Sequence, residues 1–135
     1  MPKSKLTSLD EFKLLLKDGM TIMVGGNLTD GTPEQLIDAV VDSGVKNLTL
    51  INNDGGLPQR GIGKLVANGQ VKKLIASHIG LNPIVDELMK KGRLEVELIP
   101  IGTLTEQIRA KGAGLGGILT KTGLGTLVQE WALMN

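Results

Sequence analysis

Residues 18–36 read DGMTIMVGGNLTDGTPEQL, a strand-like run that opens into a glycine-containing loop and then into a helix. The run at 21–24, Thr-Ile-Met-Val, has the β-branched and apolar side chains that strands favour. Gly25, Gly26 and Gly31 then allow backbone turns that other residues rarely adopt. The sequence therefore predicts a binding loop between a strand and a helix on an α/β scaffold.

The helix after this loop is predicted to begin with its free amides directed at the loop. Thr32 is placed to cap the first turn, and Pro33 suits the first helical position. Gln35 stands three residues after Thr32, where a capping box has its second side chain. Because N–H groups at a helix start carry partial positive charge, we expect the loop to hold a phosphate, a carboxylate or a developing oxyanion.

The composition permits one domain and excludes several functional classes. A chain of 135 residues is long enough for one hydrophobic core, so we expect a single domain over residues 1–135. It has one Phe, one Trp and no Tyr, and its net charge of +1 comes from interspersed charges, which disfavours nucleic-acid binding. The absence of cysteine excludes disulfides and thiol catalysis. No apolar run approaches membrane-spanning length, so we expect a cytoplasmic protein with no membrane, nucleic-acid or metal partner.

Strand-like and helical patterns alternate along the chain. Strands are expected at 21–24, 47–51, 71–75 and 94–99, and helices at 9–17, 33–42, 63–67, 83–91 and 103–110. Capping-box patterns mark two more helix starts, Ser8 with Glu11 and Thr103 with Glu106. The alternation predicts an open, mostly parallel sheet with right-handed crossovers and helices on both faces. Ligands bind at the carboxyl edge of such sheets, where four loops are expected to meet, beginning at Gly25, Asn52, Ala76 and Pro100.

Two adjacent amides, Asn52 and Asn53, follow the second expected strand. Their N–H groups can donate to a carboxylate or thioester oxygen in a site with little water, where a placed donor stabilises developing negative charge. An Asn-rich turn before Gly55 and Gly56 explains the same residues equally well. Spacing alone leaves both interpretations open.

The other polar candidates favour a structural role. His78, the single histidine, lies in an expected strand exit where a general base could act, but a lone histidine beside apolar Ile79 is more often packed or exposed. Glu95 and Glu97 share one face of a strand, which an exposed or helix-paired face explains. Residues 112–117 match the dinucleotide pattern G-x-G-x-x-G, but they follow a helix instead of a strand.

The C-terminal part has a different character. Six glycines lie within residues 112–125, which predicts an extended, partly buried active-site loop; a flexible linker is the alternative. The last ten residues, TLVQEWALMN, are compatible with a strand or a helix.

Five segments, in order along the chain, carry a resemblance to a known family. They are DGMTIMVGG…GTPEQLIDA, LTLINNDGG, GIGKLVANGQVKKLIASHIG…NP, LEVELIPIGTLTEQIRAKGAGLGG and TKTGLGTLVQE. Together they closely resemble the α subunit of the two-subunit, family I acyl-CoA:carboxylate CoA-transferases of the acetate/acetoacetate and 3-oxoacid type. The resemblance covers nearly the whole chain and implies an open α/β sheet related to sugar-phosphate isomerases and deaminases.

In that family, a glutamate of the β subunit, in a Glu-Asn-Gly setting, attacks the acyl-CoA thioester. An acyl-enzyme anhydride and then an enzyme-CoA thioester form, and the acceptor carboxylate resolves the thioester in ping-pong fashion. No glutamate in this sequence precedes Asn-Gly. The resemblance therefore implies an α subunit that needs a β subunit, acts on acyl-CoA and short carboxylates in a homo- or hetero-oligomer, and uses coenzyme A as a substrate with no permanently bound cofactor.

The resemblance also assigns site residues. It places the first loop near coenzyme A, with the binding residues Gly25, Gly26, Asn27, Leu28, Thr29, Asp30 and Gly31. It implies that Asn52 is an oxyanion donor with Asn53 beside it at the substrate, and that Ile101 and Gly102 lie by the acyl group. The family usually has Phe where Asn27 stands and Gln where Ile101 stands. Without that Gln a polar contact to the substrate is lost, so an altered acyl preference or weakened activity is expected.

The family's α subunit continues well past Glu130 with further strands, so the resemblance implies a chain truncated at its C-terminus, with C-terminal strands missing. Two other functions stay open. A chain without those strands would be a non-catalytic binding or assembly module that retains the fold. The scaffold would also suit a sugar-phosphate isomerase or deaminase, whose chemistry needs an acid or base at a strand exit; only His78 and Asp54 are available there.

Overall fold

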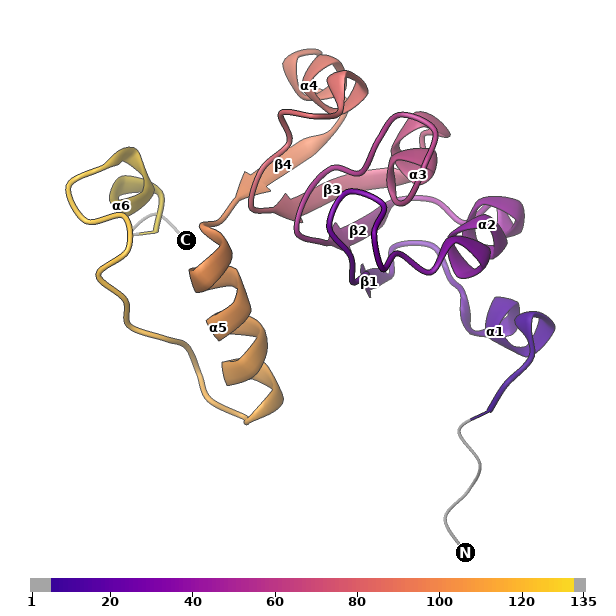
Figure 1. The fold of residues 1–135 in the computed structure, drawn as a ribbon, viewed down its shortest axis with the longest axis horizontal. Helices are drawn as coiled ribbons and strands as arrows, with labels where there is room; N and C mark the ends of the chain where they lie inside the picture. Colours follow the sequence, from indigo (N-terminus) through magenta and orange to yellow (C-terminus); the bar gives the residue numbers. More distant parts are fainter. Residues whose placement is uncertain (1–5, 133–135) are drawn as a thin grey trace, which may run out of the picture.

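The computed structural model describes residues 6–132 and adopts an α/β fold (Figure 1). Within this range the elements are α1 (Leu9–Leu15), β1 (Thr21–Met23), α2 (Glu34–Ser43), β2 (Leu48–Ile51), α3 (Gly63–Ala67), β3 (Val71–Ala76), α4 (Pro83–Lys90), β4 (Glu95–Leu98), α5 (Ile101–Gly112) and α6 (Leu127–Ala132). All expected strands and helices are present, with small shifts of their bounds. None of the helices between residues 6 and 132 is long and apolar enough to cross a membrane.

The strands form one parallel sheet in the sequential order β1-β2-β3-β4. One face carries the in-register row Ile22, Leu50, Leu74 and Val96. Because side chains alternate along a strand, the next positions form a row on the other face, Met23, Ile51, Ile75 and Glu97. The predicted open parallel α/β sheet is confirmed.

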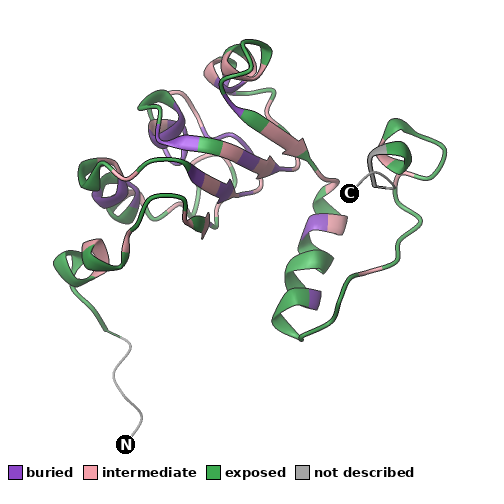
Figure 2. Ribbon diagram, turned by 180° about the vertical axis from the view of Figure 1, so that it is seen from behind, coloured by how far each residue is buried: buried purple, intermediate pink, exposed green. Residues whose placement is uncertain are grey.

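Helices α2, α3 and α4 cover a single face of this sheet. The buried core joins strand residues Leu48, Leu50, Leu74 and Ala76 to helix residues Ile37, Val40, Leu65, Val66 and Val85 (Figure 2). Helix α3 contacts both α2 and α4, so the helices form one row. We expected helices on both faces; right-handed crossovers between strands that are neighbours in sequence and in the sheet instead bring every connecting helix to one side. Helix α5 starts beyond the end of β4 and extends away from the strands (Figure 1).

The opposite face of the sheet is more exposed and carries a charged cluster. Met23 is 53% exposed there. Lys73 Nζ lies 2.9 Å from Glu95 Oε1 and 2.8 Å from Glu97 Oε2. Its hydrogen bonds to Glu97 and Glu95 raise the pKa of Lys73. The two glutamates therefore pair with the neighbouring strand, which supports their structural interpretation over acid–base chemistry.

Two helix starts form as the sequence predicts. In α1, the Glu11 N–H donates to Ser8 Oγ over 3.2 Å and the Ser8 N–H donates to Glu11 Oε2 over 3.0 Å, so the capping box is confirmed. Helix α4 begins at Pro83, and Asn82 Oδ1 accepts a hydrogen bond from the Ile84 N–H over 3.1 Å. Both caps depend only on residues close in sequence.

Two other predicted caps are wrong. Helix α2 follows Pro33 without a side-chain cap, and the Glu34 N–H donates to the carbonyl of Thr32 instead of its hydroxyl. Helix α5 begins at Ile101, before the predicted Thr103–Glu106 box. Glu106 pairs with Arg109 at 2.7 Å, so its carboxylate does not reach back to a helix start.

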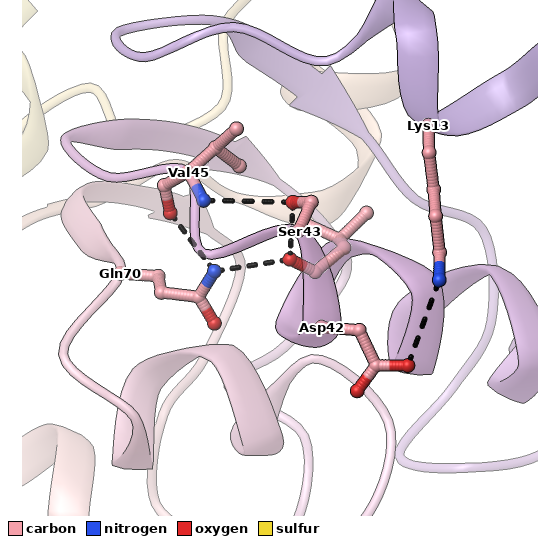
Figure 3. A network of polar contacts seen from close by, with 6 residues as sticks. Lys13, Asp42, Ser43, Val45 and Gln70 are labelled. Atoms are coloured by element: carbon pink, nitrogen blue, oxygen red, sulfur yellow. Dashed lines mark hydrogen bonds and ion pairs between the residues drawn. The ribbon is translucent and has the colours of Figure 1, made fainter. Parts of the chain in front are cut away.

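A buried polar network closes the carboxyl end of α2 (Figure 3). Gln70 is 1% exposed, and its Nε2 donates to the carbonyl of Val40 over 3.0 Å and to that of Val45 over 2.8 Å. The first bond satisfies a carbonyl in the last turn of α2, and the second fixes the segment that follows the helix. An exposed ion pair of 3.8 Å between Lys13 and Asp42 links α1 to α2 nearby.

Residues 113–126 run over the surface. Leu115, Leu119 and Leu124 are exposed, and only Ile118 and Gly123 are half-buried. The segment is therefore more exposed than the partly buried loop that we expected. Helix α6 follows it, and the last three residues of TLVQEWALMN lie outside the described range.

Candidate functional site

The loops that leave β1 and β2 lie side by side and are joined by hydrogen bonds (Figure 1). Asn52 Nδ2 donates to the carbonyl of Val24 over 2.6 Å. Asn53 Nδ2 donates to Asn27 Oδ1 over 3.0 Å. The glycine-containing loop and the double asparagine therefore meet at the carboxyl edge of the sheet, as the sequence predicts.

Asp54 adds a buried carboxylate to this junction and is 1% exposed. Its Oδ2 accepts from the Leu28 N–H over 2.7 Å and from Asn53 Nδ2 over 3.2 Å. Its Oδ1 accepts from the Gly56 N–H over 2.7 Å, as in an Asx turn. Sequence reasoning named Asp54 only as an available acid or base and missed the contact with Leu28, because nothing in the local sequence marks a partner in another loop.

The loop that leaves β3 joins the same junction through Ser77. Ser77 Oγ lies 2.6 Å from the Asn53 carbonyl oxygen and 3.0 Å from Asn53 Oδ1, and the Ser77 N–H donates to that carbonyl over 2.9 Å. Buried Asn82 ties the next segment in, because its Nδ2 donates to the Gly55 carbonyl over 2.8 Å. These contacts of Ser77 and Asn82 were not expected from the sequence; for Ser77 the available signal was a polar residue directly after a buried strand.

A tight turn shapes the first loop. Asn27 and Asp30 exchange two backbone hydrogen bonds of 3.0 Å each, which closes a two-residue turn. Leu28, its first central residue, has a φ of +59°, while Thr29 has no positive φ. This pattern is that of a type II′ turn, in which the first central position favours glycine. Leu28 is therefore held in a backbone conformation that its side chain disfavours.

The same loop presents unused backbone donors. In the described part of the chain, the N–H groups of Gly25, Gly26, Thr29 and Gly31 donate no hydrogen bond. Successive free N–H groups in a loop attract anions. These N–H groups are available to an anionic or carbonyl oxygen, whereas the sequence had led us to expect the donors at the start of α2.

The two asparagines differ in what their amides have left to donate. Asn52 is 5% exposed; its Oδ1 accepts from the Asp54 N–H over 3.0 Å, and its Nδ2 donates only to Val24. A carboxamide nitrogen has two hydrogens, so one of those on Asn52 is unused. Asn53 gives its two hydrogens to Asn27 and Asp54. Asn52 is therefore the amide with spare donor capacity.

The start of α2, which we expected to face an anion, carries its own carboxylate. Glu34 Oε2 lies 2.7 Å from Lys64 Nζ, and Glu34 Oε1 accepts from the Gly61 N–H over 2.8 Å. The hydrogen bond with Lys64 lowers the pKa of Glu34. Lys64 also pairs with Asp38 at 2.6 Å, and its bonds to Asp38 and Glu34 raise the pKa of Lys64. This network fastens α3 to the first turns of α2.

Ile101 and Gly102 are not joined to the other three loops. Between residues 6 and 132, no hydrogen bond connects either residue to the loops after β1, β2 and β3. Ile101 is 51% exposed, and Gly102 lines a separate open hollow of about 340 Å³ between α5 and residues 115–120. Adjacent strands lie ~4.8 Å apart, so β4 is roughly 14 Å from β1 across the sheet. The predicted meeting of four loops is observed for three of them.

His78 lies on the surface of the loop after β3. It is exposed, and in the range that the structure describes it takes part in no hydrogen bond or ion pair. A general base is normally oriented by a neighbouring group. The structure therefore favours the surface interpretation of His78.

Comparison with known proteins identifies the family. The family described as Coenzyme A transferase matches residues 7–133. This chain belongs to the coenzyme A transferase family. It is 57% identical over 127 residues to the acetoacetyl-CoA:acetate/butyrate CoA transferase alpha subunit of Clostridium acetobutylicum, with 94% of this chain and 58% of that protein covered. It is 54% identical over 128 residues to the acetate CoA-transferase subunit alpha of Escherichia coli, with 95% of this chain and 58% of that protein covered.

A solved structure supports the fold of this coenzyme A transferase chain. Glutaconate coenzyme A-transferase from Acidaminococcus fermentans superposes with a TM-score of 0.77 at 21% identity, over 94% of this chain and 41% of that chain. At this identity the likeness concerns the fold alone. The chain spans 58% of the length of both curated relatives.

Proposed function

We propose that this chain supplies one half of the active site of an enzyme that moves coenzyme A between an acyl-CoA and a small carboxylic or 3-oxo acid. The observation that carries the proposal is the 57% identity over 127 residues to an acetoacetyl-CoA:acetate/butyrate CoA transferase alpha subunit. The joined loops support it, because they bring unused N–H donors to the sheet edge where ligands bind.

Coenzyme A is a substrate in this proposal, with no permanently bound cofactor. The 25–31 loop binds it, since the free N–H groups of Gly25 and Gly26 suit a phosphate or carbonyl oxygen. Asn52 donates its unused amide hydrogen to the oxyanion that forms at the thioester carbon. Its small exposure favours this role, because a donor shielded from water stabilises charge more strongly.

The acyl group lies between the junction and α5 in this proposal. Asn53 lines the substrate from one side, and Ile101 with Gly102 from the other. An apolar Ile101 favours a short alkyl chain over a polar one at this position.

The nucleophile comes from a β subunit in this proposal. Both oxygens of Asp54 accept hydrogen bonds from N–H donors, and Glu34 is engaged by Lys64 and Gly61. Neither carboxylate is free to attack a thioester. A glutamate of the β subunit would form the acyl anhydride and then the enzyme-CoA thioester, so the two chains would act as a hetero-oligomer.

The test is reconstitution. The chain is mixed with a β subunit, labelled acetate and acetoacetyl-CoA, and the transfer of coenzyme A to the label is measured, with a full-length α subunit as the positive control. Transfer supports the proposal. Without transfer in a mixture where the full-length subunit works, the relationship to CoA-transferases would be one of ancestry only. Calorimetry that shows β-subunit binding without turnover would favour the non-catalytic assembly module.

A further inference from the structure

We propose that Asp54 is a positioning residue that holds the 27–30 turn and the Asn53 amide in the orientation that binds acyl-CoA. This inference rests on the proposed function. Asp54 does not reach the substrate itself, because it is 1% exposed and covered by its own partners. It acts through the residues to which it is hydrogen-bonded.

Three N–H donors surround the Asp54 carboxylate. Oδ2 accepts from the Leu28 N–H at 2.7 Å and from Asn53 Nδ2 at 3.2 Å, and Oδ1 accepts from the Gly56 N–H at 2.7 Å. The carboxylate therefore bonds to the backbone of the loop after β1, to the backbone of the loop after β2 and to the Asn53 side chain, which itself reaches Asn27. Among the described residues no cation pairs with Asp54, so its charge is compensated by N–H dipoles alone.

The hydrogen bonds at position 54 require a carboxylate. Both oxygens accept from N–H donors, and an ionised carboxylate is a pure acceptor. An asparagine of the same shape would present an NH₂ group to either Leu28 or Gly56, where two donors would oppose each other. Charge-assisted bonds of this length are also stronger than neutral ones.

The backbone of Leu28 is strained. Its φ of +59° is unfavourable for a residue with a side chain, and such a conformation persists only where the surroundings fix it. The bond from the Leu28 N–H to Asp54 is the contact that anchors this peptide to the neighbouring loop. Without it, we expect the turn to relax toward negative φ and to carry the N–H groups of the 25–31 loop away from the ligand.

The backbone and the side chain of residue 54 support different parts of the proposed site. The backbone N–H of residue 54 donates to Asn52 Oδ1, and any non-proline residue at position 54 keeps that bond. Asn52 also stays bonded to Val24. Loss of the Asp54 carboxylate should therefore disturb the binding loop while leaving the proposed oxyanion donor in place.

The experiment compares Asp54→Ala with wild type in the complex with a β subunit, because alanine removes both acceptor oxygens, whereas the oxygen of an asparagine could still accept from the Leu28 N–H. The expected result is a KM for acyl-CoA about tenfold higher, as the loss of one buried hydrogen bond implies, with kcat within about threefold. Gln70→Leu is the matched control, because Gln70 is equally buried and hydrogen-bonded but lies at the opposite end of the strands. It should lower the melting temperature while leaving KM unchanged.

The outcomes separate the two proposals. If the wild-type complex transfers no coenzyme A, the proposed function fails. If wild type is active and Asp54→Ala has the KM of Gln70→Leu, the positioning role is overturned. Should Asp54→Ala not fold, amide exchange in the wild-type complex decides the question. The Leu28 N–H should exchange at least about tenfold more slowly than the unbonded Thr29 N–H, and equal rates would overturn the role.

Discussion

Replacing Gly26 by alanine puts a methyl group where the structure leaves no room for it. Gly26 has a φ of +118°, and a Cβ built there lies 2.5 Å from Thr32 Oγ1 and 3.1 Å from the Asp30 carbonyl oxygen. Gly25, its neighbour, has no atom within 4 Å of a built Cβ. The two glycines look alike in the sequence, but only the second is required by its conformation.

The magnitude follows from these contacts. A non-glycine residue in so sparsely populated a region costs about 1–3 kcal/mol. The Thr32 hydroxyl can rotate away, whereas the Asp30 carbonyl is fixed in the turn, so roughly one further kcal/mol is expected from displaced backbone. We therefore expect Gly26→Ala to lower the free energy of unfolding by about 2–4 kcal/mol, and Gly25→Ala by less than about 0.5 kcal/mol.

The assay is urea denaturation of both variants, followed by far-UV circular dichroism, with thermal melting in parallel. For a chain of this size, 1 kcal/mol corresponds to ~3 °C, so Gly26→Ala should melt roughly 6–12 °C below wild type. An equal loss of stability in the two variants would refute the reasoning. A loss below about 0.5 kcal/mol for Gly26→Ala would do the same.

Three further predictions concern the site and its surroundings. Asn52→Ala should lower the transfer rate of the reconstituted complex about 100-fold through loss of an oxyanion donor. It should lower the free energy of unfolding by only about 1–3 kcal/mol. An unchanged rate would remove Asn52 from the site. The lowered pKa of Glu34 means that its stabilising contribution is present above its ordinary pKa of 4.5 and is lost as pH falls through the lower folded value. Glu34→Gln should therefore lose less unfolding free energy on acidification than wild type does, by less than about 1 kcal/mol because the pair is partly exposed. An equal loss in the variant and in wild type would contradict this. Ile101→Gln, at an exposed position, should leave stability within about 0.5 kcal/mol and shift the kcat/KM ratio between two acyl acceptors by up to about tenfold; identical ratios would place Ile101 outside the acyl site.

Local signals in the sequence were enough to predict the elements but not all of their ends. The Ser8–Glu11 box and the helix start at Pro83 form as predicted, because each cap involves residues a few positions apart. The Thr32 cap fails although its pattern is as good, because α2 begins at Glu34 and Pro33, which has no capping side chain, occupies the N-cap position. A capping pattern works only if the helix begins where the pattern expects it.

At the junction of the loops, too, the contacts between residues far apart in sequence could not be predicted. That the glycine loop and the double asparagine would meet followed from parallel strands sharing a carboxyl edge. That Asp54 would bind the Leu28 N–H did not follow, because the contact spans 26 residues and depends on the register of β1 with β2. The position of the helices on one face could likewise not be predicted from the sequence, because it depends on the order of the strands in the sheet.

Strand order also explains why the loop after β4 stays apart from the loop after β1. Neighbouring strands lie ~4.8 Å apart, a distance that short side chains such as Asn52, Asn53 and Asp54 bridge, so the exits of β1, β2 and β3 lock together. The exit of β4 is too far from β1 for any such side chain, and Ile101 there stays exposed. In the proposed function, a substrate that touches both ends would lie across the exits of β2 and β3. A second subunit placed over this edge would bring its carboxylate to the donors that the first loop leaves free.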